Sequence, residues 1–336
     1  MTFNSTKQLL TIAIPTYNRC QYLRQCLSTL MPQVAVAAPY VKVLVIDNNS
    51  TDNTADIAAD FQAQYPAYIT IMRNKENIGA DANIANCFAE CTTTYAWVFG
   101  DDDVLMPGAL ATLLAKINEC EYGVIHLCAF SYVGSVEACR PHRTKGRYEV
   151  FNPENVENML YEVSDMFSFI TGNIVNKSLV PADIDIHEFL WTRYNQIQWV
   201  FGALFAGHPN LLIDDALLAI NNDGNSGGYP FCKIFGTNFN VLFRAFEHRG
   251  LPTRYFDTIN RRMARELFAP LIYFARKDQG FRNYMPEDHF GELKPNFSKY
   301  WEFWVFVAPM CKLPKILLYP HFFGVRILNR IYRYVR

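Results

Sequence analysis

The stretch YAWVFGDDDVLMP, residues 95–107, decides the fold, because an apolar strand runs there directly into the carboxylates of Asp101, Asp102 and Asp103. Adjacent carboxylates repel each other, and their charge at the end of a buried strand costs stability unless a cation or hydrogen-bond donors offset it. Hard oxygen ligands of this kind suit Mg²⁺ or Mn²⁺, and these ions can hold nucleotide phosphates. Alternatively, the three residues cap a helix that begins near Pro107.

Three similar units precede this stretch, and each is a short β-rich run followed by a polar turn and a helical pattern. The β-rich runs lie at 9–16, 41–46 and 68–73, and the third leads into a helix over about 81–91. With the strand before the aspartates as the fourth, this order predicts an α/β fold with a mostly parallel central sheet flanked by helices. The polar loops then meet at the carboxyl ends of the strands, where open α/β sheets bind ligands.

Four segments in this order resemble family 2 glycosyltransferases of the GT-A fold, a Rossmann-like α/β architecture. They are IPTYN (14–18), VIDNNSTD (45–52), NIG (77–79) and the acidic turn. The resemblance is close from residue 9 to about 115 and thins out to about 228. It implies transfer of a sugar from a nucleoside diphosphate sugar to an acceptor hydroxyl. Fold likeness alone would not establish that activity, but the site residues themselves match.

The resemblance also implies which residues bind the nucleotide sugar. Asp47 would hydrogen-bond the base or ribose, although its surroundings have the composition of an ordinary Asx-rich turn. Gly79 would allow close approach of the backbone, and Asp81 is either part of this set or only the cap of the helix that follows. The full set is Pro15, Thr16, Tyr17, Arg19, Asp47, Asn77, Gly79, Asp81, Asp101, Asp102, Asn225 and Ser226.

The metal motif departs from the family pattern. When the chain is aligned on Pro107, the commonest first aspartate of the motif falls on Gly100, while residues 101–103 still supply a D-x-D. We therefore expect direct metal contact from Asp102 or Asp103. Asp101 is then expected to bind the ribose or a metal-bound water.

The acceptor side carries a weaker signal. The segment FSFITGNIV (167–175) resembles the family's acceptor-side strand and turn, in which Gly172 and Asn173 would face the cleft. The polar loop NNDGNSGG (221–228), which contains Asn225 and Ser226, resembles the loop that closes over the donor diphosphate, and its glycines suit a lid. A plain surface loop is the alternative.

An inverting transferase also needs a general base, usually Asp or Glu, near the acceptor hydroxyl. The expected place, WTRYNQIQW (191–199), contains no carboxylate. Asp185 and Glu188, just upstream, are our candidates for this catalytic base. Other candidates are Asp183, His187, Asp214 and Asp215, and ordinary surface solvation is the alternative for each of them.

Composition limits the possible partners and the cellular compartment. The chain has 336 residues with 31 basic and 32 acidic side chains, so it shows no bias toward nucleic acid. Nine cysteines without a C-x-x-C pair, and no signal peptide, indicate reduced thiols in the cytoplasm and argue against zinc. We expect a GT-A domain over 1–230, with a nucleotide-sugar half at about 1–120 and an acceptor half at about 121–230, and a helical C-terminal region over 231–336.

The tail from Phe303 onward has a different character. It contains no acidic residue and six basic ones, among many aromatic and aliphatic side chains. Prolines and lysines interrupt the apolar run, so a membrane-spanning helix of about 20 residues is not expected. Aromatic and basic residues together favour peripheral contact with an anionic membrane surface. The alternatives are a helical appendage packed on the catalytic domain and an oligomer contact.

The sequence thus predicts an enzyme of the glycosyltransferase class that uses Mg²⁺ or Mn²⁺. The expected acceptor is a glycan or lipid-linked oligosaccharide at the inner face of the plasma membrane, in O-antigen or other surface polysaccharide synthesis. The acidic turn and the FITGN segment are similar to those of O-antigen transferases, including ones that handle deoxysugars such as abequose. The alternatives are a nucleotidyltransferase, whose glycine-rich basic signature we do not find near the first strand, and a non-catalytic nucleotide-sugar-binding protein.

Overall fold

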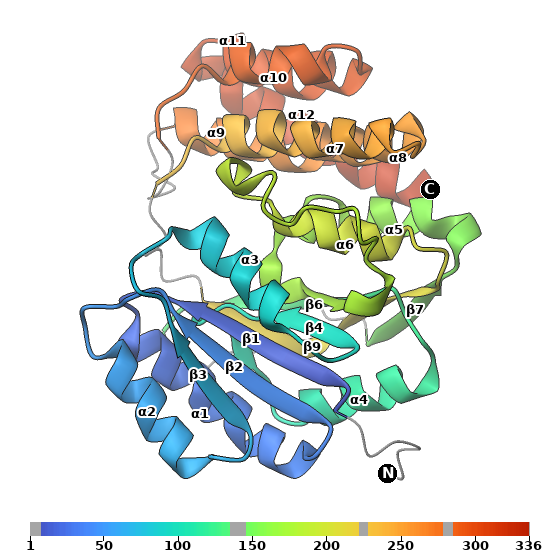
Figure 1. The fold of residues 1–336 in the computed structure, drawn as a ribbon. Helices are drawn as coiled ribbons and strands as arrows, with labels where there is room; N and C mark the ends of the chain where they lie inside the picture. The colour runs from blue at the N-terminus through green and yellow to red at the C-terminus, as the bar shows by residue number, and fades with distance from the viewer. Residues whose placement is uncertain (1–7, 135–145, 222–227, 278–284, 336) are drawn as a thin grey trace. The chain divides into compact units, whose positions relative to one another are not determined.

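The computed structural model describes residues 8–134, 146–221, 228–277 and 285–335 (Figure 1). They belong to two compact units. The first comprises Met1–Val156 with Met166–Asp223, and the second comprises Glu157–Asp165 with Gly224–Arg336.

The first unit is built on a parallel sheet. Strands β1 (Leu10–Thr16), β2 (Val41–Asp47), β3 (Ile69–Arg73) and β4 (Tyr95–Val98) pair in parallel in the order β3-β2-β1-β4. These are the four strands that the sequence predicts, so the predicted α/β class is confirmed. Thr16 lies opposite Asp47 in the register of β1 and β2, so the polar turns after these two strands start at the same level.

The sheet continues as a mixed sheet beyond β4. Strand β8 (Asn173–Asn176) runs antiparallel to both β4 and β6 (Val124–Tyr132), and β9 (Asn210–Asn221) runs parallel to β6. The strands β5 (Val104–Leu105) and β7 (Arg147–Phe151) pair antiparallel with β9. Short 3₁₀ turns lie at Pro153–Asn155, Ser164–Ser168, Ile170–Gly172, Lys177–Leu179 and Leu190–Thr192.

Helices cover both faces of the parallel strands (Figure 1). The helices α1 (Cys20–Ala37), α2 (Thr54–Gln64) and α4 (Ala109–Glu119) lie on one face, and α3 (Ala80–Glu90) lies on the other. Helix α1 buries Leu23, Leu27, Leu30 and Val34, whose three- and four-residue spacing places them on one side of the helix. Helix α6 (Gln196–Leu204) lies beside α3, where Trp199 stacks on Phe88 with ring centroids 4.5 Å apart.

Two asparagines shape the turns at the carboxyl end of the sheet. Asn18 and Asn49 have φ values of 52° and 64°, a left-handed conformation that asparagine adopts more readily than most residues with a side chain. The Asn18 side-chain oxygen accepts a hydrogen bond from the Thr51 backbone N–H at 2.7 Å. The turn after β1 is thereby tied to the turn after β2.

The second unit is helical in its described residues, as the sequence predicts for the C-terminal region. It contains part of α5 (Val156–Val163), then α7 (Phe239–His248), α8 (Thr253–Met263), α9 (Ala269–Arg276), α10 (His289–Phe297), α11 (Ala308–Lys312) and α12 (Lys315–Val335). π-Helical turns lie at Cys232–Asn238, Ala264–Phe268 and Phe303–Val307. The described helices include none that is both long and apolar enough to cross a membrane.

Candidate active site

A pocket of about 360 Å³ lies in the first unit, at the carboxyl ends of β1, β2 and β4. It is the edge of the sheet at which the sequence predicts ligand binding. Its walls are formed by Pro15, Thr16, Tyr17, Arg19, Asn48, Ala80, Asn83, Ile84, Gly100, Asp101 and Ile170. The expected nucleotide residues Pro15, Thr16, Tyr17, Arg19 and Asp101 are therefore brought together.

The turn after β1 holds the acidic turn through direct side-chain contacts. Thr16 Oγ1 donates a hydrogen bond to Asp101 Oδ2 at 2.7 Å, and Arg19 Nε lies 3.0 Å from Asp101 Oδ1. Arg19 Nη2 also bonds Asp102. Asp101 and Asp103 are buried, with exposed fractions of 6% and 3%, whereas the Asp102 side chain is 35% exposed.

Thr171 holds the other side of the acidic turn. Its hydroxyl donates to Asp103 Oδ2 and accepts from the Gly100 backbone N–H at 2.8 Å. The Trp97 indole N–H donates to the Thr171 carbonyl at 2.8 Å, which fixes the threonine against β4. The sequence reasoning missed Thr171, although a hydroxyl inside the FITGN segment was a signal that could have found it.

The same geometry explains why glycine occupies the position at which the family has an aspartate. A Cβ atom at Gly100 would lie 2.8 Å from Asp103 Oδ2 and 3.1 Å from Thr171 Oγ1. Both distances are shorter than an ordinary contact, so a side chain at residue 100 would displace the carboxylate from the threonine. The acidic motif of this chain therefore consists of residues 101–103.

The electrostatics of the acidic turn fit a divalent cation. Of its three carboxylates, those of Asp101 and Asp102 contact the guanidinium of Arg19, and that of Asp103 accepts from the Thr171 hydroxyl. Burial raises the pKa of Asp101 to about 7, an effect that Arg19 reduces and Asp102 increases. Burial, followed by repulsion from Asp102, raises the pKa of Asp103 to about 8. Hard oxygen ligands with an excess of negative charge match the requirements of Mg²⁺ or Mn²⁺.

These pKa values predict how the stability of the metal-free protein depends on pH. An aspartate ionises near pH 4 in an unfolded chain, whereas Asp101 and Asp103 keep their protons up to about 7 and about 8 in the folded chain. The folded state thus binds more protons than the unfolded state between these limits, so its free energy of unfolding falls as pH rises from about 4 to about 8. We expect the Tm from calorimetry to fall over this range, and to fall less in Asp103→Asn, which cannot ionise. If Tm fell equally steeply with pH in the wild type and in Asp103→Asn, Asp103 would not be a buried group that keeps its proton.

A network of asparagines fixes the start of α3 beside the pocket. Asn48 Nδ2 donates to Asn77 Oδ1 at 2.8 Å, and Asn48 Oδ1 accepts from the Ile78 backbone N–H at 3.1 Å. Gly79, with φ of 86°, follows as the residue before the helix. Asn48 was missed by the sequence reasoning, which treated it as part of an Asx-rich turn. The free backbone N–H groups at a helix start attract anions such as phosphate.

Asp47 lies beneath this network at the end of β2 and is only 1% exposed. Its Oδ1 accepts a hydrogen bond from the Ser50 backbone N–H at 2.9 Å. Its Oδ2 forms an ion pair with Arg73 Nε at 3.5 Å and has no hydrogen-bond donor among the described residues. Arg73, a residue that the sequence reasoning did not select, also donates to the Ser50 carbonyl at 2.7 Å.

The structure places the two acceptor-side residues inside the first unit. Asn173 is buried, with its side-chain oxygen 2.9 Å from His126 Nδ1 and its side-chain nitrogen donating to the Phe167 and Phe169 carbonyls. A Cβ atom at Gly172 would lie 3.0 Å from the Phe169 ring. Burial lowers the pKa of His126 to about 4, so this histidine is neutral. These contacts hold the turn that brings Ile170 and Thr171 to the site.

The two carboxylates predicted as the general base lie at the surface, whereas Asp81, predicted as a donor-binding or capping residue, is partly buried. Asp185 and Glu188 are exposed, and Asp185 Oδ1 accepts a hydrogen bond from the His187 backbone N–H at 2.8 Å, which forms a local turn. Asp81, in the first turn of α3, is partly buried. Burial raises the pKa of Asp81 to about 6, and the Arg193 backbone N–H lowers it in part. The segment 191–199, in which the base was expected, thus contacts Asp81.

The last two expected residues, Asn225 and Ser226, lie outside the described residues.

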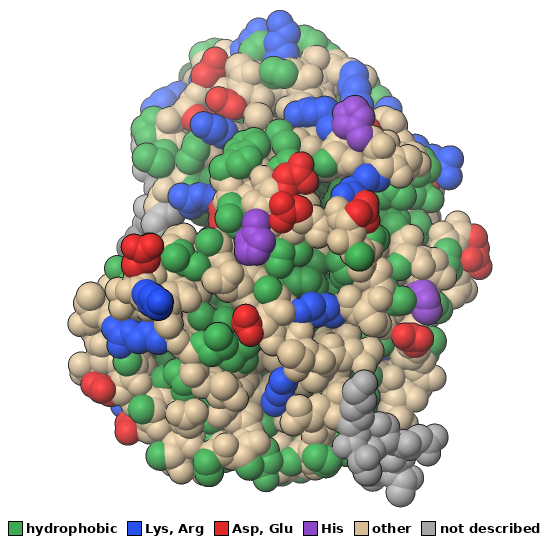
Figure 2. All heavy atoms as spheres, viewed as in Figure 1, with side chains coloured by type: hydrophobic (Ala, Val, Ile, Leu, Met, Phe, Trp, Pro, Cys, Tyr) green, Lys and Arg blue, Asp and Glu red, His purple; other side chains and the backbone are tan. Residues whose placement is uncertain are grey.

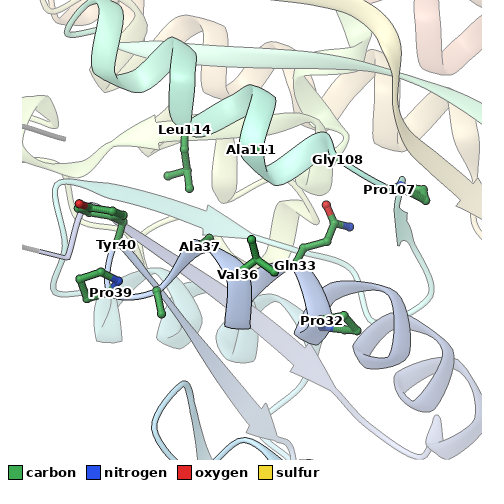
Figure 3. Close-up of a pocket in the computed structure, with 11 residues that line it drawn as sticks. Pro32, Gln33, Val36, Ala37, Pro39, Tyr40, Pro107, Gly108, Ala111 and Leu114 are labelled. Atoms are coloured by element: carbon green, nitrogen blue, oxygen red, sulfur yellow. The ribbon is translucent and has the colours of Figure 1, made fainter. Parts of the chain in front are cut away.

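A larger pocket of about 660 Å³ lies between the end of α1 and the start of α4 (Figure 3). None of its lining residues is a carboxylate or a basic residue. The amide of Gln33, which lines it, accepts from the Leu110 backbone N–H at 3.2 Å and donates to the Leu105 carbonyl at 3.3 Å. Because this pocket offers no charged group, we place the functional site at the smaller pocket.

Comparison with known proteins agrees with this site. Residues 11–179 match the family described as "Glycosyl transferase family 2". The matched region is half of the chain and contains the acidic turn, Thr16, Arg19 and Thr171. The chain belongs to glycosyl transferase family 2.

Two relatives show the range of similarity. Abequosyltransferase RfbV of Salmonella typhimurium is 31% identical over 201 residues, which is 56% of this chain and 59% of that protein. A GalNAc(5)-diNAcBac-PP-undecaprenol beta-1,3-glucosyltransferase of Campylobacter jejuni is 25% identical over 38% of this chain and 40% of that protein. The chain therefore matches less than two thirds of the length of each of these relatives.

Solved structures show the fold. S. aureus TarS 1–349 in complex with UDP has a TM-score of 0.58 and 14% sequence identity, over 98% of this chain and 92% of that one. The same protein without the ligand gives a TM-score of 0.55. The predicted GT-A fold is confirmed.

Proposed function

We propose that this chain is a metal-dependent glycosyltransferase that moves a sugar from a nucleoside diphosphate sugar to an acceptor hydroxyl. One observation carries the proposal: a buried acidic turn, held by Thr16, Arg19 and Thr171, opens into a pocket at the carboxyl edge of the sheet. Membership of family 2 supports it. The proposed cofactor is Mg²⁺ or Mn²⁺.

Each part of the pocket has a proposed role in binding the donor. A cation held by Asp102 and Asp103 would compensate the negative charge of the departing nucleoside diphosphate. Asp101, whose two oxygens are engaged by Thr16 and Arg19, is proposed to orient the ribose or a metal-bound water. Asn77 and Gly79 hold the start of α3 toward the phosphates, and Asp47 is proposed to accept from the base or ribose through its buried Oδ2.

The general base is proposed among Asp185, Glu188 and Asp81. The first two are the sequence candidates, and both are exposed. Asp81 combines a place on α3, next to the pocket residue Ala80, with a pKa of about 6. A base with a pKa close to the working pH transfers protons most effectively.

The proposed acceptor is a lipid-linked oligosaccharide at the inner face of the plasma membrane, in O-antigen or other surface polysaccharide synthesis. The Campylobacter relative, whose name specifies a diphosphate-linked undecaprenol, and the Salmonella abequosyltransferase support this choice. The role would require the chain to work close to a membrane surface.

Helix α12 supports peripheral membrane contact. One side of it packs on the second unit through Leu318, Phe322 and Val325, and Phe322 stacks on Tyr273 with ring centroids 4.1 Å apart. The opposite side exposes large apolar residues at three- and four-residue spacing, with exposed fractions from 45% to 83%: Ile316, Tyr319, Phe323, Ile327 and Ile331. We call these five residues the apolar stripe.

Basic residues accompany the apolar stripe. Arg326 and Arg330 are exposed on the same helix, and Lys315 begins it. Figure 2 shows basic side chains beside hydrophobic ones over the C-terminal helices. An exposed apolar stripe bordered by positive charge is the pattern of a helix that lies in the interface of an anionic membrane.

Nucleotide binding tests the proposed function. We expect Asp47→Ala to weaken the affinity for a nucleoside diphosphate at least tenfold, about 1.4 kcal/mol, in calorimetry with Mn²⁺. The reason is that the variant lacks the buried acceptor Oδ2, which lies next in sequence to the pocket residue Asn48. A second variant, Asp47→Asn, keeps an acceptor for the Ser50 N–H and therefore controls for a folding defect. The matched control for loss of a carboxylate is Asp60→Ala, on the exposed side of α2.

Donor hydrolysis separates the enzyme from a binding protein of the same fold. A panel of nucleotide sugars is incubated with the full chain and Mn²⁺, and release of free sugar is measured. A glycosyltransferase slowly hydrolyses its donor, whereas a non-catalytic binding protein binds the nucleotide and releases none. In the binding experiment, unchanged nucleoside diphosphate affinity in both Asp47 variants would show that Asp47 does not bind the nucleotide.

A further inference from the structure

Three potential metal ligands meet in the second unit, away from the acidic turn in sequence. Cys232 begins the first π-helical turn, and Glu287 and His289 lie at the start of α10. Their ligand atoms, one sulfur, one carboxylate oxygen and one ring nitrogen, all lie within 4.8 Å of one another. We call these three residues the Cys-Glu-His cluster.

The distances in the Cys-Glu-His cluster are those of ligands around one small ion. Cys232 Sγ is 3.6 Å from His289 Nδ1, and His289 Nδ1 is 3.6 Å from Glu287 Oε1. Zinc bonds of about 2.3 Å to sulfur and about 2.0–2.1 Å to nitrogen or oxygen, at tetrahedral angles, place ligand atoms about 3.4–3.6 Å apart. The two measured distances match this geometry, and the remaining pair of ligand atoms lies within 4.8 Å.

The cluster is also shielded and oriented. Cys232 is fully buried, and the side chains of Glu287 and His289 are 5% and 16% exposed. Glu287 Oε1 accepts from the Cys232 backbone N–H at 2.8 Å, and Oε2 accepts from the Lys233 N–H at 3.0 Å. A carboxylate oxygen has two lone pairs, so Oε1 can accept this bond and still bind a metal. Such outer hydrogen bonds hold metal ligands in place.

From this geometry we propose that Cys232, Glu287 and His289 form a structural zinc site in the second unit. Thiolate, imidazole and carboxylate are the ligand types that zinc takes, and they distinguish this site from the all-oxygen acidic turn, which suits Mg²⁺ or Mn²⁺. Metal binding deprotonates the Cys232 thiol and releases that proton to solvent. The three residues would supply three of the four ligands of a tetrahedral zinc ion, and water would complete the set.

The site would link two distant parts of the chain. Cys232 and Glu287 are 55 residues apart, and their contact closes a loop that contains α7, α8 and α9. A bond across this loop removes conformational freedom from the unfolded chain and stabilises the folded second unit. The sequence reasoning against zinc relied on the missing C-x-x-C pair, which does not detect ligands brought together by helix packing.

Cobalt substitution tests the proposal with a signal independent of transferase activity. The full-length protein is stripped with a chelator, titrated with Co²⁺ and then with Zn²⁺, and followed by absorption spectroscopy. We expect a thiolate-to-cobalt charge-transfer band that saturates at one equivalent and is displaced by Zn²⁺. The carboxylates of the acidic turn do not give such a band, and Cys26→Ser controls for the thiol that lies 3.9 Å from the Gly100 carbonyl.

Matched variants assign the ligands. Cys232→Ser should abolish the charge-transfer band, and His289→Gln and Glu287→Gln should lower the Co²⁺ affinity at least tenfold. Cys87→Ser, at a buried cysteine of α3, should leave the band unchanged. Circular dichroism checks the folding of each variant. If Cys232→Ser does not fold, the Co²⁺ affinities of His289→Gln and Glu287→Gln test the proposal. A wild-type protein without the band, or a Cys232→Ser protein that keeps it, would overturn the proposal.

Discussion

The Asp103→Asn protein is expected to lose turnover by at least about 100-fold, or about 2.7 kcal/mol of transition-state stabilisation. In the proposed reaction, a cation at Asp102 and Asp103 balances the charge that develops on the leaving nucleoside diphosphate. Asparagine keeps the shape and the acceptor for the Thr171 hydroxyl but supplies no negative charge. Sugar transfer or donor hydrolysis measured at saturating Mn²⁺ provides the readout.

The fold of this variant is expected to remain intact. Burial, followed by repulsion from Asp102, raises the pKa of Asp103, so an uncharged side chain of the same shape removes an unfavourable buried charge and not a favourable ion pair. Asp60→Asn, at an exposed position of α2, is the control for a general effect of charge removal. Wild-type turnover in a folded Asp103→Asn protein would refute the assignment of this carboxylate to the metal.

Loss of positive charge from α12 is expected to weaken vesicle binding by roughly 30-fold. The double variant Arg326→Gln/Arg330→Gln removes two exposed charges, each of which contributes about 1 kcal/mol near an anionic surface. Sedimentation with phosphatidylserine-rich liposomes at low salt measures the effect. Because charge is screened, wild-type binding should also weaken as salt rises, and the apolar stripe should leave a salt-resistant remainder.

A second variant tests the salt-resistant part of vesicle binding. Phe323→Ser/Ile327→Ser removes exposed apolar area from the stripe and should abolish the salt-resistant binding. Deletion of everything after Glu302 is a poorer test, because Leu318, Phe322 and Val325 are buried in the second unit and their loss would expose its core. Arg24→Gln/Lys75→Gln, exposed basic residues of the first unit, is the matched control. Equal vesicle binding by wild type and both α12 variants, or none by any of them, would show that α12 is structural.

The sequence alone predicted the order of strands and helices in the first unit and the α/β fold class. Each strand is a short β-rich run followed by polar residues, and α1 repeats its apolar residues at helical spacing, so these signals are local. The acidic turn was found for the same reason, since its three aspartates are consecutive. The helical character of the C-terminal region, predicted over 231–336, was also readable from the sequence, but its π-helical turns were not.

Only the tertiary structure decided which groups surround the acidic turn. Asp103 and Thr171 are 68 residues apart in the sequence, and Arg19 and Asp102 are 83 apart. A short pattern contains no information about such a pair, because the two side chains meet only after β1, β4 and the turn before β8 have packed together. The close fit around Gly100, and the raised pKa values that follow from burial, depend on the same packing.

The second unit shows most clearly which features the sequence predicts and which ones depend on tertiary packing. Its sequence determines amphipathic helices and a basic, aromatic last helix, because apolar periodicity and charge can be read residue by residue. Which side of α12 is exposed was decided by packing, since Leu318 and Phe322 are covered while Phe323 and Ile327 are not. The meeting of Cys232 with Glu287 and His289 was decided in the same way, because their contact depends on how the helices between them fold back and not on any local motif.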